Sequence, residues 1–277
     1  MEHVLAFSLG GNWELPQASC LACADRTSKF EGVVARAFYG TLRNTANYPT
    51  RNKKGRPKSI VLQKTAPDGT KRPVVIPVEN FPRIFPVVTL PLAGILTGAP
   101  LSESNPDMQI GLGADDAAEM EKLKALFEPG ASFELPLQID FYNLSLTLAK
   151  TAHAFVVANL GFDGYEPYLP DVVREVNPHR SHFVGGWPWP VGGYVGNPLL
   201  GLTITKRNGY LVVLIELFHG RLSAFGVVAG RIVDPYLLGN AQRHPRVVGK
   251  SDFVQTTPHS EDKLSPSKSA GARVKRK

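Results

Sequence analysis

Residues that could carry chemistry gather near the start of the chain. Glu2 and His3 are adjacent, and Cys20 and Cys23 form a Cys-x-x-Cys pair shortly before an apolar, helix-like stretch. A carboxylate beside an imidazole suits metal-assisted hydrolysis of a phosphodiester. The carboxylate holds a divalent cation that neutralises phosphate charge, and the neutral imidazole takes a proton from water. A side-chain amide between them and the helix, such as Asn12, can fix the imidazole tautomer.

Short elements must position these residues. The pattern predicts strands over 4–8 and 13–15, joined by a turn at Gly10-Gly11-Asn12. A helix is predicted to start near Cys23 and to end before Pro49, because apolar residues recur there with a period of 3.6. The first 48 residues therefore predict strand, turn, strand and helix.

This segment resembles the HNH endonucleases, the ββα-metal nucleases, and in particular bacterial and phage HNH-like proteins. The resemblance covers residues 2–50 and is carried by the Glu-His start, the Leu-Gly-Gly turn and the run from Ala18-Ser19-Cys20 to Thr27-Ser28-Lys29-Phe30-Glu31. It implies that Glu2 is a ligand of Mg²⁺ or Mn²⁺, that His3 is the general base and that Asn12 orients it. It also implies that DNA is the substrate.

The cysteines match half of the family's structural zinc ribbon. Relatives place a first Cys-x-x-Cys upstream of Glu-His, whereas only Met1 precedes Glu2 here. A structural Zn²⁺ needs four ligands, so we expect zinc only if further ligands exist. Either the start is misassigned or the copy is truncated and weakened. A redox pair and two inert thiols are the alternatives for Cys20 and Cys23.

The helix position after the second cysteine also departs from the family. Relatives carry Asn or His there, and this chain has Ala24. Asp25 is one step further and could bind the same divalent cation, although it is turned by about 100° around the helix. A helix-capping role is the alternative for Asp25.

A basic run at 51–58 follows the helix without any acidic residue. It predicts either contacts to nucleic-acid phosphates or a solvated linker. Single-strand stacking is not predicted, since no aromatic residue interrupts the run. The candidate phosphate-binding residues are Arg51, Lys53, Lys54, Arg56 and Lys58.

The remainder has the pattern of an α+β domain. Antiparallel strands are predicted over 59–65 and 73–78, over 202–207 and 210–218 around Asn208-Gly209, and over 225–233, with a possible edge strand inside 81–100. Two helices are expected, one from Asp115 or Asp116 to Phe127 and one over 141–160, while 161–200 has the composition of loops.

Composition fits this division. The 26 Gly and 23 Pro favour turns and short strands over a helical bundle, and 43% hydrophobic residues suffice for a core. We expect an α+β protein with a truncated HNH-like ββα module at 1–48, a basic linker at 49–58, a mainly antiparallel domain of unknown function at 59–249 and a disordered basic tail at 250–277. No apolar run reaches the length of a membrane span, so a cytoplasmic protein is expected.

Two functions follow from these patterns. The first is an HNH-type, metal-dependent endonuclease acting on DNA phosphodiesters. The alternative is a non-catalytic nucleic-acid-binding protein that retains an HNH relic. The net charge of +7 fits both, because both need an anionic partner.

Overall fold

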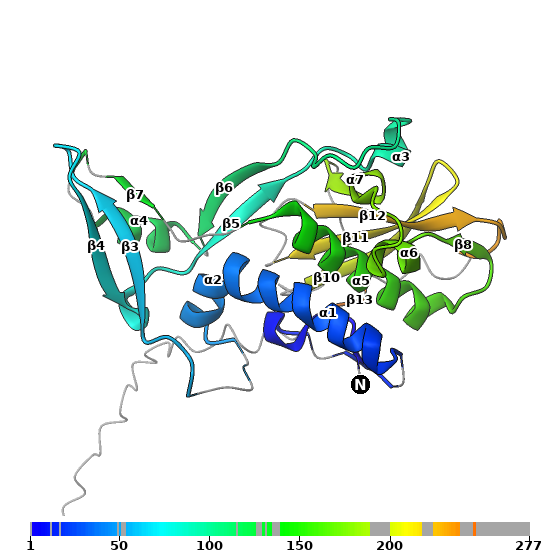
Figure 1. The fold of residues 1–277 in the computed structure, drawn as a ribbon, viewed down its shortest axis with the longest axis horizontal. Helices are drawn as coiled ribbons and strands as arrows, with labels where there is room; N and C mark the ends of the chain where they lie inside the picture. The colour runs from blue at the N-terminus through cyan, green and yellow to red at the C-terminus, as the bar shows by residue number, and fades with distance from the viewer. Residues whose placement is uncertain are drawn as a thin grey trace, which may run out of the picture.

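Antiparallel sheets and helices share the chain in the computed structural model (Figure 1), which confirms the α+β class. The structure describes residues 2–11, 13–16, 18–48, 50, 54–114, 116–125, 129–130, 132–134, 139–188, 200–217, 224–238 and 246–247. The predicted tail at 250–277 lies outside these residues.

The largest sheet is built on the predicted hairpin. Strand β10 (Leu200–Arg207) pairs antiparallel with β11 (Tyr210–Leu217), which pairs with β12 (Ala224–Ile232). Asn208 and Gly209 have φ of 51° and 81°, as a type I′ turn requires. Three short strands complete the sheet: β8 (Tyr165–Pro167), β9 (Val184–Trp187) and β13 (Arg246–Val247).

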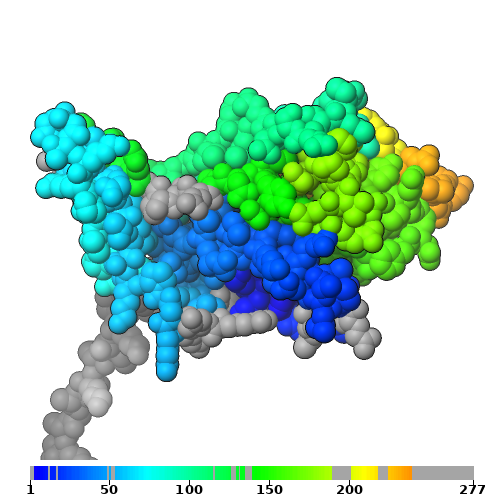
Figure 2. Space-filling view, in the orientation of Figure 1, coloured from blue at the N-terminus to red at the C-terminus, as the bar shows by residue number. Residues whose placement is uncertain are grey.

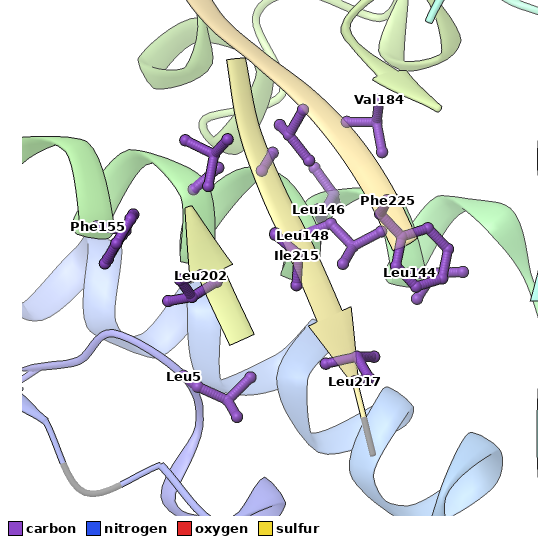
Figure 3. Packing of buried hydrophobic residues seen from close by; sticks show 14 of the residues in the cluster. Leu5, Leu144, Leu146, Leu148, Phe155, Val184, Leu202, Ile215, Leu217 and Phe225 are labelled. Carbon is purple, nitrogen blue, oxygen red and sulfur yellow. The ribbon is translucent and has the colours of Figure 1, made fainter. Parts of the chain in front are cut away.

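A long central helix, α5 (Phe141–Leu160), lies between this sheet and the N-terminal helix α1 (Leu21–Val33). Leu144, Leu148 and Phe155 of α5 pack with sheet residues such as Ile215 and with the N-terminal residue Leu5 in one buried cluster (Figure 3). The N-terminal segment therefore shares its hydrophobic core with the region beyond the basic run.

A second, smaller unit projects from one end of the molecule and is drawn in cyan and green at the left of Figure 2. Strands β3 (Ser59–Thr65), β4 (Lys71–Pro77) and β7 (Ser132–Glu134) form its sheet, and α4 (Ala117–Ala125) belongs to the same unit. Its own buried cluster holds Ile60, Leu62, Ile76, Phe81, Ile84 and Leu123. Strands β5 (Ile84–Thr89) and β6 (Gln109–Ala114) pair with each other between this unit and the main body.

The two helices expected after residue 59 are present as α4 and α5, but they are not alone. Short helices α3 (Gly94–Thr97), α6 (Leu169–Val173) and α7 (Arg180–Phe183) also form, and the last two interrupt the stretch expected to be loop. Helices of four or five residues leave no periodic signal in a sequence.

The Val-Gly-Gly segment of β9 is explained by a close backbone approach. A Cβ on Gly186 would lie 2.1 Å from the Leu90 carbonyl oxygen, and one on Gly185 would lie 2.5 Å from that of Pro91. The Gly186 amide donates to the Pro91 carbonyl at 2.7 Å. Only glycine at these positions lets the backbone of segment 90–93 pack directly against the backbone of β9.

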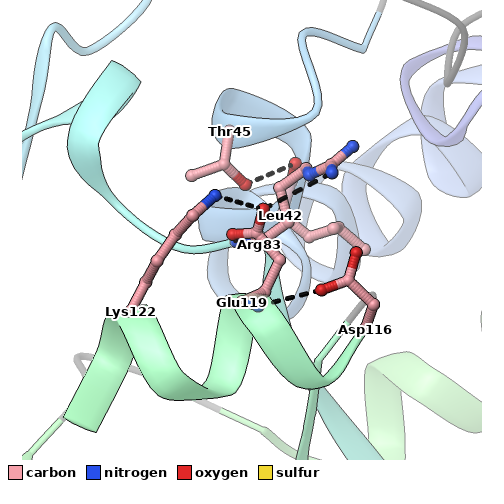
Figure 4. Close-up of polar contacts among 6 residues, drawn as sticks. All are labelled: Leu42, Thr45, Arg83, Asp116, Glu119 and Lys122. Carbon is pink, nitrogen blue, oxygen red and sulfur yellow. Dashed lines mark hydrogen bonds and ion pairs between the residues drawn. The ribbon is translucent and has the colours of Figure 1, made fainter. Parts of the chain in front are cut away.

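One buried carboxylate joins α4 to the turn before β5 (Figure 4). Glu119 is 5% exposed and accepts hydrogen bonds from the Arg83 amide at 2.9 Å and from the Lys122 ammonium at 2.8 Å. The Asp116 side chain caps α4 by accepting from the Glu119 amide at 2.9 Å. Burial raises the pKa of Glu119, but the bonds from Lys122 and Arg83 outweigh it, so the pKa is lowered overall.

Replacing Glu119 with glutamine is expected to lower the free energy of unfolding by about 1–3 kcal/mol at neutral pH, since a buried charge-assisted acceptor is lost. Because the folded-state pKa is lowered, the carboxylate's contribution is complete above its unfolded pKa of about 4.3 and is lost as the pH falls through the folded value. Urea unfolding of both proteins at pH 7 and at pH 3 measures this difference.

Glu121→Gln is the matched control for that experiment. Glu121 is on the same helix, is 68% exposed and pairs with Lys124, which is also exposed. Its loss should change stability by no more than about 0.5 kcal/mol. Equal effects of the two substitutions at pH 7 would contradict the role assigned to Glu119.

Candidate functional site

A short hairpin and a tight turn position the N-terminal residues. Strand β1 (Glu2–His3) pairs antiparallel with β2 (Glu14–Leu15), and a 3₁₀ turn over Phe7–Leu9 lies between them. The predicted strand at 4–8 is therefore wrong. Gly10 has φ of 89°, and a Cβ on Gly11 would lie 1.9 Å from the Leu5 carbonyl oxygen, so these two glycines fold the chain back before a strand can extend.

His3 lies on the wall of a cleft beside α1. Its side chain is 14% exposed, and Nε2 is 3.6 Å from Oε1 of Glu14, its partner across the hairpin. Asn12, the residue expected to orient the imidazole, lies outside the described residues. Glu14 is a nearby carboxylate that sequence reasoning missed, although the hairpin register could have indicated it.

A buried ion pair fixes the strand of His3 to two helices. The Lys150 ammonium of α5 donates to the His3 carbonyl and lies 2.8 Å from Oε1 of Glu31 on α1. The two charged side chains are 6% and 12% exposed. Burying two charges costs much desolvation energy, and removing either partner would leave the other as an uncompensated buried charge. Because Lys150 contacts both residues, it fixes the position of the His3 backbone relative to the Glu31 side chain.

The cleft has a volume of about 830 Å³ and runs along α1, α2 (Gly40–Thr45) and segment 55–57. Its charged lining residues are His3, Glu31, Arg36, Arg43 and Arg56. Glu31 pairs with Lys150. Among the residues that the structure describes, no carboxylate forms an ion pair with the three guanidinium groups.

A π-helical turn carries Arg36, the first of the three cleft arginines. After α1 the chain widens over Val34–Phe38, where the Tyr39 amide donates to the Val34 carbonyl at 3.0 Å. Arg36 sits in this turn, and its guanidinium lies over Gly32, where a Cβ would be 3.0 Å from Nη1. Turns of this kind recur at functional sites. The helical pattern extending past residue 33 predicts continued helix but not this widening.

Arg43 forms the inner part of the cationic wall. It donates to the Ser8 carbonyl at 2.5 Å and to the Ala35 carbonyl at 2.8 Å. Burial lowers the pKa of Arg43, and the neighbouring positive charges of Arg56 and Arg36 lower it further. The three groups therefore repel one another, and an anion in the cleft would relieve that repulsion.

Of the three predicted nucleic-acid-binding residues that the structure describes, Arg56 lines the cleft. Arg56 donates to the Asn47 side-chain oxygen and to the Tyr48 carbonyl. Lys54 and Lys58 are exposed and do not line the cleft, while Arg51 and Lys53 lie outside the described residues. Arg56 also lines a second pocket of about 570 Å³, in which Arg83 and Lys122 pair with Glu119 and Glu79 is a further carboxylate, so this pocket is of mixed charge.

Cys20 and Cys23 begin α1 and are both free thiols. Cys20 is the N-cap residue, and its Sγ accepts from the Cys23 amide at 3.4 Å. That amide, followed by the Cys23 thiol, lowers the pKa of Cys20. The hydrogen bond between the two cysteine side chains raises the pKa of Cys23. Neither cysteine lines the cleft that contains His3.

We expect iodoacetamide at pH 8 to modify Cys20 several-fold faster than Cys23. The thiolate is the reactive form, and Cys20 combines the lowered pKa with the more exposed position. Mass spectrometry of digested samples taken over time gives the two rates. In Cys20→Ser the remaining thiol should react slowly. Equal rates for both residues would contradict the assignment.

The described residues do not assemble the expected metal sites. No three His, Cys, Asp or Glu side chains converge among them. Asp25 is 67% exposed, pairs with Lys29 at 2.7 Å and does not line the cleft. Glu2 is placed only by its backbone in β1, and its side chain lies outside the description.

Comparison with known proteins gives no family. No protein-family model, no curated protein and no solved structure matches the chain. No helix within the described ranges is long and apolar enough to span a bilayer.

Proposed function

We propose that the cleft binds the phosphate backbone of nucleic acid. The observation that carries the proposal is the convergence of Arg36, Arg43 and Arg56 on one cleft with no carboxylate paired to them among the described residues. Guanidinium groups bind phosphate oxygens in pairs of parallel hydrogen bonds, and repulsion among them favours a multiply charged anion. The cleft runs along α1, α2 and residues 55–57, and this length suits a chain of phosphates more than a single small phosphate.

Fluorescence anisotropy with a labelled DNA strand tests this proposal. The intact chain should bind, and the logarithm of the association constant should fall linearly with the logarithm of salt concentration. Polyphosphate should compete, because it presents the same anionic oxygens. Absence of binding at 50 mM salt would refute the proposal.

Phosphodiester hydrolysis in the same cleft is the second candidate. It is favoured by the position of His3 on the cleft wall, where its imidazole can accept the proton of a water molecule that attacks phosphorus as the bond to the leaving oxygen breaks. The arginines would stabilise the charge gained by the phosphoryl oxygens. The order of hairpin and helix is also that of the ββα resemblance.

Plasmid nicking separates the two candidates. Supercoiled DNA is incubated with the protein and Mg²⁺ or Mn²⁺, and with EDTA as a comparison. An enzyme should nick the plasmid, and His3→Gln should abolish nicking while leaving anisotropy binding unchanged. Binding without nicking under either cation would leave the binding function alone.

A further inference from the structure

An aromatic ring is presented to the cationic cleft. Phe7 lines the cleft with 37% of its surface exposed, whereas Leu9, two residues along the same 3₁₀ turn, is 5% exposed. The second pocket also has a phenylalanine, Phe81, but that ring is 4% exposed and belongs to the small core. Phe7 is thus placed on the cleft surface and not in a core.

The backbone that carries Phe7 is tightly held. The Leu9 amide donates to the Ala6 carbonyl at 2.8 Å, and the Gly10 amide donates to the Phe7 carbonyl at 2.9 Å. On one side the Phe7 ring lies 5.6 Å from the His3 ring, with 34° between their planes. A ring fixed in this way loses little conformational entropy when a flat ligand stacks on it.

Isolated exposed aromatic residues are common and need no function. Phe162, for example, is 62% exposed but lines neither described pocket. Phe7 differs because it shares one cleft with Arg36, Arg43 and Arg56. An aromatic face beside guanidinium groups is the combination that binds a base and its adjacent phosphates in single-stranded nucleic acid.

We propose that Phe7 stacks on a nucleobase, so that the cleft takes a single-stranded segment in preference to a continuous duplex. This inference rests on the proposed nucleic-acid function. Bases inside a duplex are stacked on one another and offer no free face to Phe7. A cleft of about 830 Å³ is within the range that accommodates a small organic ligand, and so has room for a nucleotide.

The test compares three probes of equal length: a single-stranded oligonucleotide, the same strand in a duplex, and a strand of abasic sites with the same phosphates. Wild-type protein should bind the normal strand about 5- to 150-fold more tightly than the abasic strand. This is the change in affinity that the stacking of one base on an aromatic side chain produces. Phe7→Leu should reduce that ratio toward one, while Phe7→Tyr should retain it. Phe162→Leu is the control for an exposed phenylalanine outside the cleft.

Each other outcome has a definite meaning. Wild-type protein that binds none of the probes refutes the proposed function itself. Protein that binds the normal and abasic strands equally, or binds the duplex as tightly as the single strand, refutes only the stacking inference. Equal weakening of the normal and abasic strands by Phe7→Leu, with an intact unfolding temperature, also refutes it.

Discussion

Replacing Arg36 and Arg56 together by glutamine is expected to weaken binding of a DNA strand by about 10- to 100-fold at 0.1 M salt. Each neutralised phosphate contributes about 0.7–0.9 to the slope of log K against log salt, so the loss of two contacts should also reduce the magnitude of that slope by about 1.4–1.8. Anisotropy titrations between 50 and 200 mM salt measure both quantities. Arg43 is left unchanged because its bonds to the Ser8 and Ala35 carbonyls join two separate segments. Within the described part of the chain, Arg56 bonds only to the adjacent residues Asn47 and Tyr48, and the unfolding temperature of the variant checks that its loss leaves the fold intact.

Arg72 provides the matched control for this experiment. It is exposed on β4 and lines neither described pocket. Arg72→Gln removes one positive charge and the double substitution removes two, so a general effect of net charge would appear in both proteins in proportion to the charge removed. If Arg72→Gln weakens binding as much per charge as the double substitution, the cleft is not the binding surface.

Lys150→Met should lower the free energy of unfolding by about 3–5 kcal/mol. The substitution leaves the Glu31 carboxylate, 12% exposed, without the ammonium that lies 2.8 Å away, and it removes the donor to the His3 carbonyl. Methionine keeps the length and helix propensity of the lysine stem, so the cost arises from the charge. Urea unfolding followed by circular dichroism gives the value.

A double-substituted protein tests the cause. Lys150→Met combined with Glu31→Gln removes both charges of the pair and should recover much of the lost stability, because the buried carboxylate is neutralised together with its ammonium. Lys29→Met is the control on α1, since Lys29 is 72% exposed and its pair with Asp25 should contribute no more than about 1 kcal/mol. A small effect of Lys150→Met, comparable with that of Lys29→Met, would contradict the assignment.

Elements with strong local signals could be predicted from the sequence. Strand β3 and helix α5 have their predicted bounds, and the Asn208-Gly209 hairpin and the third antiparallel strand formed as expected. In each case the signal is local, either a turn with positive φ or a periodic apolar pattern. The 3₁₀ turn at Phe7–Leu9 escaped prediction because its apolar residues also fit a strand, and only the close approach of Gly11 to Leu5 decides between them.

The candidate site was harder to predict because its parts come from distant segments. His3 and Arg56 were both named from the sequence and both line the cleft, while the catalytic role predicted for His3 stays a prediction. Arg36 and Arg43 were passed over because isolated arginines on a helix carry no sequence motif. Lys150 joins His3 and Glu31 across more than a hundred residues, and no local pattern reports such a pairing.

The ion pair between α1 and α5 has a consequence for the order of events during protein synthesis. The first 48 residues leave the ribosome long before Lys150 is made, and until then the Glu31 carboxylate and the His3 carbonyl lack the ammonium that fixes them. We therefore expect a ribosome-bound nascent chain stalled before α5 to be protease-sensitive throughout its first 48 residues. Protection should arise only once α5 has emerged from the exit tunnel.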